Sequence, residues 1–186
     1  NGKAWKPENY DKKFRGPTTL QRGVEESINV VTVKLLEKVG IRKVVEAARR
    51  LGVQSPLDDN LALALGSSDL SLLELTSAYG ALANQGVWMP PMAIRYVTDN
   101  QGKLLEENIP QGREAVSPEV AYAMTHMLRG VVERGTGVGA KAVGRPIAAT
   151  PVSHAAVRVT SLSSLTGRVL LRRLVERRLA PLRAEV

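Results

Sequence analysis

Apolar residues recur at helical spacing over two consecutive stretches near the start of the chain. In residues 29–39, valine and leucine lie three residues apart and Gly40 follows them, which predicts a helix that ends at a glycine cap. Residues 41–51 place apolar side chains on one face and charged side chains on the other, and Gly52 follows. We therefore expect two amphipathic helices joined by a tight connection.

Two pairs of polar residues have the spacing of a capping box, in which side chains satisfy the first backbone N–H groups of a helix. Ser71 and Glu74 precede a further run of periodic apolar residues, so we expect a helix directly after Ser71. Thr18 and Gln21 have the same spacing. This second pair predicts a short helix that begins at about Leu20.

Later in the chain the pattern changes from helical to β-prone and back. Residues 94–98 and 103–105 are separated by the turn formers of residues 99–102, which predicts a small hairpin. Ser117-Pro118 has the form of an N-cap followed by proline at the first helical position. The glycines of residues 135–137 are expected to end that helix. Helices therefore dominate the elements that the pattern predicts.

The composition is that of a globular protein and excludes several kinds of chemistry. The chain has 186 residues, of which 44% are hydrophobic and 24% charged, so we expect one folded body. It has no cysteine, which rules out a disulfide, a thiolate ligand and a cysteine nucleophile. His126 and His154 lie far apart and lack the spacing of a zinc site. We expect neither a metal ion nor another cofactor.

The net charge of +8 is unevenly distributed. Up to Thr150 the chain has 19 basic and 16 acidic residues, whereas residues 151–186 have seven arginines and two acidic residues. Residues 170–179 would form a basic amphipathic helix. Because the excess charge lies in this tail, we expect no nucleic-acid partner for the chain. No stretch has the roughly 18 apolar residues of a membrane helix, and residues 1–11 do not resemble a targeting signal.

Short strings of residues occur in an order that resembles one protein family. The strings are Trp5-x-Pro7-x-Asn9-Tyr10-Asp11, Phe14-x-Gly16-Pro17-x-Thr19-Leu20, Glu26-Ser27-Ile28-Asn29, Leu51-Gly52-Val53, Asn60-Leu61-Ala62-Leu63-Ala64-Leu65-Gly66, Leu73-Glu74-Leu75-Thr76-x-Ala78-Tyr79, Ala83-Asn84-x-Gly86 and Gly135-Thr136-Gly137. Together they resemble the transpeptidase domain of class A, bifunctional penicillin-binding proteins. Each string alone is weak, whereas the whole set in family order makes a chance match hard to sustain.

The resemblance implies an α+β fold, mainly helical in this part, of the penicillin-binding protein and serine β-lactamase-like transpeptidase type. It implies a serine-type D-Ala-D-Ala transpeptidase, usually fused to a peptidoglycan glycosyltransferase, that cross-links peptidoglycan stem peptides and is acylated by β-lactams. Such proteins work at the extracytoplasmic face of the bacterial cytoplasmic membrane. A serine β-lactamase is the neighbouring alternative, but the string from Trp5 to Asp11 favours the synthase side of the superfamily.

The active site of this family uses three motifs, and Ser27-Ile28-Asn29 matches the second, Ser-x-Asn. The resemblance assigns Ser27 the role of a proton relay between a lysine and the leaving amine, because a hydroxyl can both donate and accept. It assigns Asn29 the role of orienting that lysine and the substrate peptide. Without the resemblance, both residues would be interpreted as N-caps of the helix that follows.

The other two motifs, Ser-x-x-Lys and Lys-Thr-Gly, do not occur in the sequence. The family typically continues with the third motif after Arg145-Pro146-Ile147-Ala148, where this chain reads Ala149-Thr150-Pro151-Val152. We expect residues 1–148 to be a partial transpeptidase domain, incomplete at both ends and inactive alone. Residues 149–186 are expected to be a basic tail unlike the family, out of frame or unstructured. The alternative is a non-catalytic interaction module whose basic tail binds an acidic partner, a nucleic acid or an anionic membrane.

Overall fold

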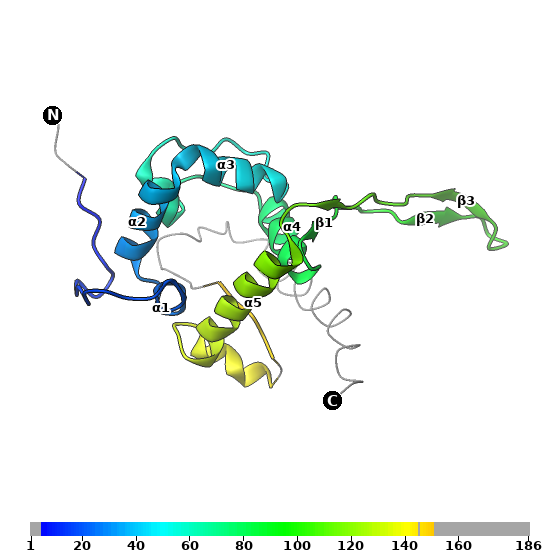
Figure 1. Ribbon diagram of the computed structural model, residues 1–186. Coiled ribbons are helices and arrows are strands. Elements are labelled where there is room, and N and C mark those ends of the chain that lie inside the picture. The colour runs from blue at the N-terminus through cyan, green and yellow to red at the C-terminus, as the bar shows by residue number, and fades with distance from the viewer. Residues whose placement is uncertain (1–4, 145, 151–186) are drawn as a thin grey trace.

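The computed structural model describes residues 5–144 and 146–150, and Figure 1 shows how their elements are arranged. The α-helices are α1 (Leu20–Glu25), α2 (Asn29–Val39), α3 (Ile41–Arg50), α4 (Leu72–Ala83) and α5 (Pro118–Glu133). The strands are β1 (Val87–Trp88), β2 (Tyr96–Thr98), β3 (Leu104–Glu107) and β4 (Arg113–Glu114). Short 3-10 helices span η1 (Leu61–Leu65) and η2 (Val138–Val143). The helix predicted for residues 170–179 lies outside the described residues.

The two helices predicted for residues 29–51 are confirmed. They meet at Gly40, whose φ of 93° lies in the region that favours glycine, and Gly52 after α3 has a φ of 94°. α2 buries Val33 and Leu36 on the apolar stripe that the sequence pattern indicated. α3 has no fully buried residue, and its charged face is open to solvent.

The predicted starts of α4 and α5 are confirmed by their caps. The Ser71 hydroxyl accepts a hydrogen bond from the Glu74 backbone N–H, and the Glu74 carboxylate accepts one from the Ser71 N–H. At α5, the Ser117 hydroxyl accepts from the Val120 N–H, with Pro118 as the first helical residue. Both helices therefore begin where the local sequence placed them.

The capping box predicted at Thr18 is wrong, although the helix does begin at Leu20. Thr19 caps α1, and its hydroxyl accepts from the Arg22 backbone N–H at 3.2 Å. The Gln21 side chain does not close a box, because its amide donates to the Glu25 carboxylate at 2.8 Å. The Gln21 side chain thus binds Glu25, one turn further along the same helix. In a capping box it would instead accept a hydrogen bond from a backbone N–H.

The predicted hairpin is confirmed, and it projects away from the helical body (Figure 1). β2 and β3 pair antiparallel, with Tyr96 opposite Glu107 and Val97 opposite Glu106. β1 and β4 pair antiparallel at the base of this projection. Every residue of β2 and β3 is exposed. Among the described residues, the hairpin is therefore supported through its base.

The densest part of the core lies around α5. This helix buries Ala121, Leu128, Val131 and Val132, and Val131 is fully inaccessible. α5 packs against both α1 and α4, and α1 leads directly into α2. Because α1 is short, its position depends on α5 more than on its own hydrogen bonds.

Candidate active site

Ser27 and Ile28 form the turn between α1 and α2, and Asn29 is the first residue of α2. Ser27 has a φ of 54°, in the left-handed region that non-glycine residues seldom adopt. Its N–H donates to the Val24 carbonyl at 3.2 Å, and the Ile28 N–H donates to the Gly23 carbonyl at 2.9 Å. Ile28 is buried, whereas Ser27 is partly open to solvent. The surrounding contacts therefore hold an unfavourable backbone conformation at the serine.

Neither polar side chain of this turn caps α2. The N-cap residue is Ile28, which makes no side-chain cap. The Ser27 hydroxyl has no hydrogen bond to another described residue. Asn29 is the first helical residue, and its Nδ2 donates to the Glu8 carbonyl at 3.1 Å. The interpretation of Ser27 and Asn29 as simple N-caps is therefore wrong.

Asn9, in the loop before α1, caps α2 instead. Its side chain is buried, and Oδ1 accepts from the Val30 N–H at 3.1 Å. Its Nδ2 donates to the Lys13 carbonyl at 2.6 Å. Together with the bond from Asn29 to Glu8, these contacts join the N-terminal loop to the start of α2. Sequence reasoning missed this role, because the bonded groups lie 21 positions apart and local patterns do not reveal such pairs.

A small pocket of about 100 Å³ opens beside Ser27, between the turn and the N-terminal loop. Arg15 lines the pocket and forms ion pairs with Asp11 at 2.5 Å and with Glu26 at 3.5 Å. A hydrogen bond from the Lys13 N–H, assisted by Arg15, lowers the pKa of Asp11. The charged residues Asp11, Arg15 and Glu26 therefore line the pocket together with Ser27. The Ser27 hydroxyl forms no hydrogen bond with another described residue.

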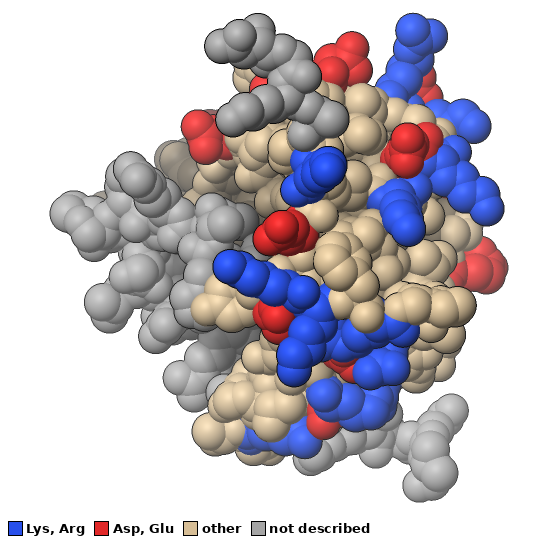
Figure 2. Space-filling model, turned by 90° about the vertical axis from the view of Figure 1, so that its left-hand side faces the viewer, with Lys and Arg blue, Asp and Glu red and all other residues tan. Residues whose placement is uncertain are grey.

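Figure 2 shows the molecule from the side on which α2 and the N-terminal loop lie. Lysine and arginine side chains gather over this face, with carboxylates scattered among them. Lys12 and Lys13 in the loop and Lys34 and Lys38 on α2 are exposed, and none forms an ion pair with a described residue. A face of this kind favours the approach of anions.

Behind the turn, Glu25 connects α1 to the end of α5. The Nη2 and Nε atoms of Arg134 donate to the two carboxylate oxygens of Glu25 at 2.6 and 3.3 Å. These bonds, with the one from Gln21, hold the pKa of Glu25 below its ordinary value. Sequence reasoning missed this pair as well, because its members lie 109 positions apart.

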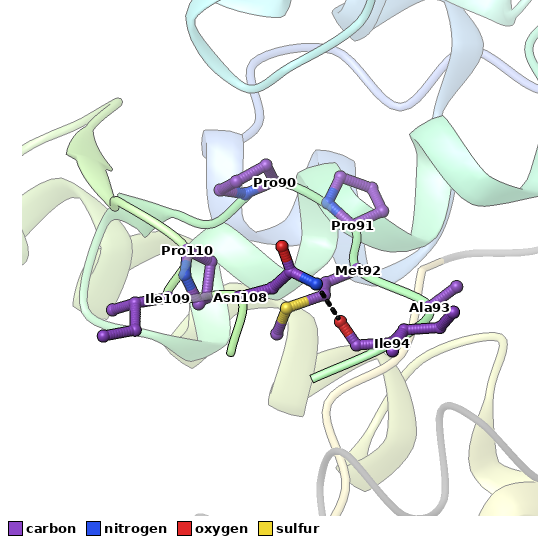
Figure 3. Close-up of a pocket in the computed structure, with 8 residues that line it drawn as sticks. All are labelled: Pro90, Pro91, Met92, Ala93, Ile94, Asn108, Ile109 and Pro110. Atoms are coloured by element: carbon purple, nitrogen blue, oxygen red, sulfur yellow. Dashed lines mark hydrogen bonds between the residues drawn. The ribbon is translucent and has the colours of Figure 1, made fainter. Parts of the chain in front are cut away.

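A larger pocket of about 360 Å³ lies at the base of the hairpin (Figure 3). Three prolines, two isoleucines and Met92 form most of its wall. Asn108 supplies the polar contact drawn there, from Nδ2 to the Ile94 carbonyl at 3.1 Å. The wall has no titratable side chain, so it offers no acid, base or nucleophile.

Within the described part of the chain, no group of three or more His, Cys, Asp or Glu side chains could hold a metal ion. His126 stacks on Tyr122 with ring centroids 6.4 Å apart, and His154 lies outside that part. None of the described helices combines the length and the hydropathy that a membrane crossing requires.

This helical body, with a Ser-x-Asn turn between two helices, has the fold of penicillin-binding protein transpeptidases. The chain superposes on penicillin-binding protein 1A from Haemophilus influenzae with a TM-score of 0.70 and 22% identity, over 76% of this chain and 27% of that one. It superposes on the D,D-transpeptidase domain of a peptidoglycan glycosyltransferase from Eggerthella lenta with a TM-score of 0.64 and 25% identity, over 75% and 42%. The expected fold class is confirmed.

The sequence model of the penicillin binding protein transpeptidase domain matches residues 1–149. Penicillin-binding protein 1A of Aquifex aeolicus is 37% identical over 147 residues, which cover 79% of this chain and 20% of the relative. Penicillin-binding protein 1B of Vibrio cholerae is 35% identical over 137 residues, covering 73% and 18%. The chain belongs to the penicillin-binding protein transpeptidase family, as its motifs indicated, and spans about a fifth of the length of these relatives.

Proposed function

We propose that this chain is part of a D,D-transpeptidase that cross-links peptidoglycan stem peptides, with the Ser27 turn in its active site. Family membership supports cell-wall cross-linking as the reaction. The observation that carries the proposal concerns the Ser27 hydroxyl. It forms no hydrogen bond with another described residue, and it lies at a pocket that is also lined by Asp11, Arg15 and Glu26. The proposed place of action is the extracytoplasmic face of the bacterial cytoplasmic membrane, as for the family.

Each polar group of the turn has a part in the proposed reaction. The attacking serine and its lysine would belong to a Ser-x-x-Lys motif, which this sequence does not contain. Ser27 would pass a proton from that lysine to the leaving amine, since a hydroxyl donates and accepts at once. Asn29 uses Nδ2 to bind Glu8, which leaves its Oδ1 for the lysine or the stem peptide. By this account the chain alone is inactive.

A β-lactam is a suitable probe of this proposal, because a structural relative, penicillin-binding protein A of M. tuberculosis, forms an imipenem acyl-enzyme. The test uses a hybrid in which residues 1–149 of this chain replace the matching segment of the A. aeolicus protein. We expect a fluorescent penicillin to acylate the hybrid and not the isolated chain. Ser27→Ala should slow acylation of the hybrid roughly 100-fold or more, because positioned proton transfer contributes about 10²–10⁴-fold.

The matched control is Ser77→Ala on α4, whose hydroxyl makes only a long bond of 3.4 Å to the Met89 carbonyl. This variant should be acylated at the rate of the unsubstituted hybrid. Equal acylation of the two serine variants would overturn the role of Ser27. The interaction module would then be the better account, and salt-sensitive binding that disappears on deletion of residues 151–186 would support it.

A further inference from the structure

The junction between the end of α1 and the end of α5 is held by an ion pair between Glu25, which is largely buried, and Arg134, whose side chain is half exposed. The Glu25 side chain is only 11% exposed, and both of its oxygens accept from the Arg134 guanidinium. The amide of Gln21 donates to one of the same oxygens. Paired hydrogen bonds of this kind fix the relative orientation of two groups as well as their distance.

The backbone at the same junction is equally constrained. The Thr136 N–H donates to the Glu25 carbonyl at 3.0 Å. A Cβ atom on Gly135 would lie 2.0 Å from that carbonyl oxygen, and one on Gly130 would lie 2.0 Å from Oε1 of Glu25. A side chain at either glycine would therefore prevent Glu25 from packing against this segment. Glu25 is therefore fixed through its side chain and through its main chain.

The position of this junction bears directly on Ser27, because only Glu26 separates Glu25 from Ser27 in the sequence. The N–H groups of Ser27 and Ile28 bond back to carbonyls in α1, so the turn moves with the last turn of that helix. A helix of six residues does not hold its own position. The backbone of the Ser27 turn is thus linked through α1 to the contacts that Glu25 makes with the segment at the end of α5.

We propose that Glu25 and Arg134 are positioning residues for acyl transfer, which hold α1 against α5 and so aim Ser27 and Asn29 at the reacting groups. The inference rests on the proposed function of the Ser27 turn. A plain stabilising ion pair is the competing account. It predicts that loss of the pair lowers global stability without any specific effect on the turn.

The first experiment measures amide hydrogen exchange in the 186-residue chain itself. Glu25→Gln keeps the shape of the side chain and removes its charge. We expect exchange at the Ser27 and Ile28 amides to accelerate about tenfold or more, with the α4 amides unchanged. The matched control is Arg129→Gln, five residues before Arg134, which breaks an exposed pair with Glu133. Equal protection at Ser27 in the two variants would overturn the inference.

The second experiment measures the acylation rate and the pre-covalent penicillin affinity of the hybrid enzyme. Glu25→Gln should slow acylation about 10- to 100-fold at unchanged affinity, because small displacements of a catalytic group have effects of this size. The exchange of partners, Glu25→Arg with Arg134→Glu, should recover part of the rate. Arg129→Gln should be neutral.

The two proposals fail in different ways. If Ser27→Ala has no effect on the hybrid, the proposed function fails. If Ser27→Ala is slow but Glu25→Gln behaves like Arg129→Gln, the function stands and the positioning role is overturned. Should the hybrid not fold, the exchange measurement on the chain decides the positioning role, because it needs no catalytic activity.

Discussion

Asn9 stabilises the candidate site from outside the helix that it caps. A side-chain amide can accept and donate at once, and Asn9 uses both groups, toward the Val30 N–H and the Lys13 carbonyl. The side chain is buried, so water does not replace a lost bond without cost. Ile28 cannot cap α2 itself, which explains why a distant residue has this role.

Replacement of Asn9 by alanine should therefore lower the free energy of unfolding by about 1–3 kcal/mol, the usual cost of leaving a buried polar group unpaired. Urea denaturation of the chain measures this loss. The matched control is Asn60→Ala, because Asn60 caps the short η1 helix at an exposed position. That variant should lose about 1 kcal/mol or less. A loss for Asn9→Ala no larger than for the control would contradict the capping role.

At the scale of elements, prediction from sequence succeeded where the determining contacts are local. Ser71 with Glu74 and Ser117 with Pro118 mark their helices because the bonded groups lie within one helical turn. The same rule failed at Thr18, where Gln21 bonds to Glu25. Local sequence patterns could not predict the contacts of Asn9, Glu25 and Arg134, because these contacts join segments that only the folded chain brings together. The family strings located the turn but did not reveal what holds it.

The Glu74 carboxylate makes both a local contact within its own helix cap and contacts with residues distant in the sequence. It closes the box of α4, and it also accepts from the Ser55 hydroxyl and from the backbone N–H groups of Gln54 and Ser55. The Ser55 hydroxyl and the Gln54 N–H are the main causes that hold the pKa of Glu74 well below its ordinary value of 4.5. One side chain thus attaches the segment after α3 to the start of α4.

This lowered pKa predicts the sign of a pH effect on stability. A carboxylate with a lower pKa in the folded state stabilises the fold above its unfolded pKa, and this contribution is lost as the pH falls below about 4.5. Glu74→Gln should therefore be less stable than the unsubstituted chain at pH 7, and the difference should shrink below pH 4.5. Urea titrations at several pH values measure it. Glu107→Gln, on exposed β3, is the control and should not change the profile.

At the scale of the whole molecule, the described residues form a helical body from which an uncovered hairpin extends (Figure 1). A two-stranded hairpin without a covering layer is marginal in water. Within the described part of the chain, no further strand pairs with either edge of this hairpin, and open edges promote association with other chains. Large apolar side chains add to this tendency, with Leu105 at 61% exposure and Ile109 at 77%.

We therefore expect the isolated chain to self-associate as its concentration rises, and the hairpin to be the principal cause. The double variant Leu105→Lys with Ile109→Lys should shift the weight-average mass in sedimentation velocity toward the monomer, because charges on an edge oppose strand pairing. Leu73→Lys is the matched control, since Leu73 is 58% exposed but lies on α4 and not on the β2–β3 hairpin. If Leu73→Lys reduced association as much as the double variant, general apolar exposure rather than the hairpin edge would be responsible. A chain that stays monomeric at all concentrations would contradict the expectation altogether, and the base formed by β1 and β4 would then suffice to keep the hairpin from pairing.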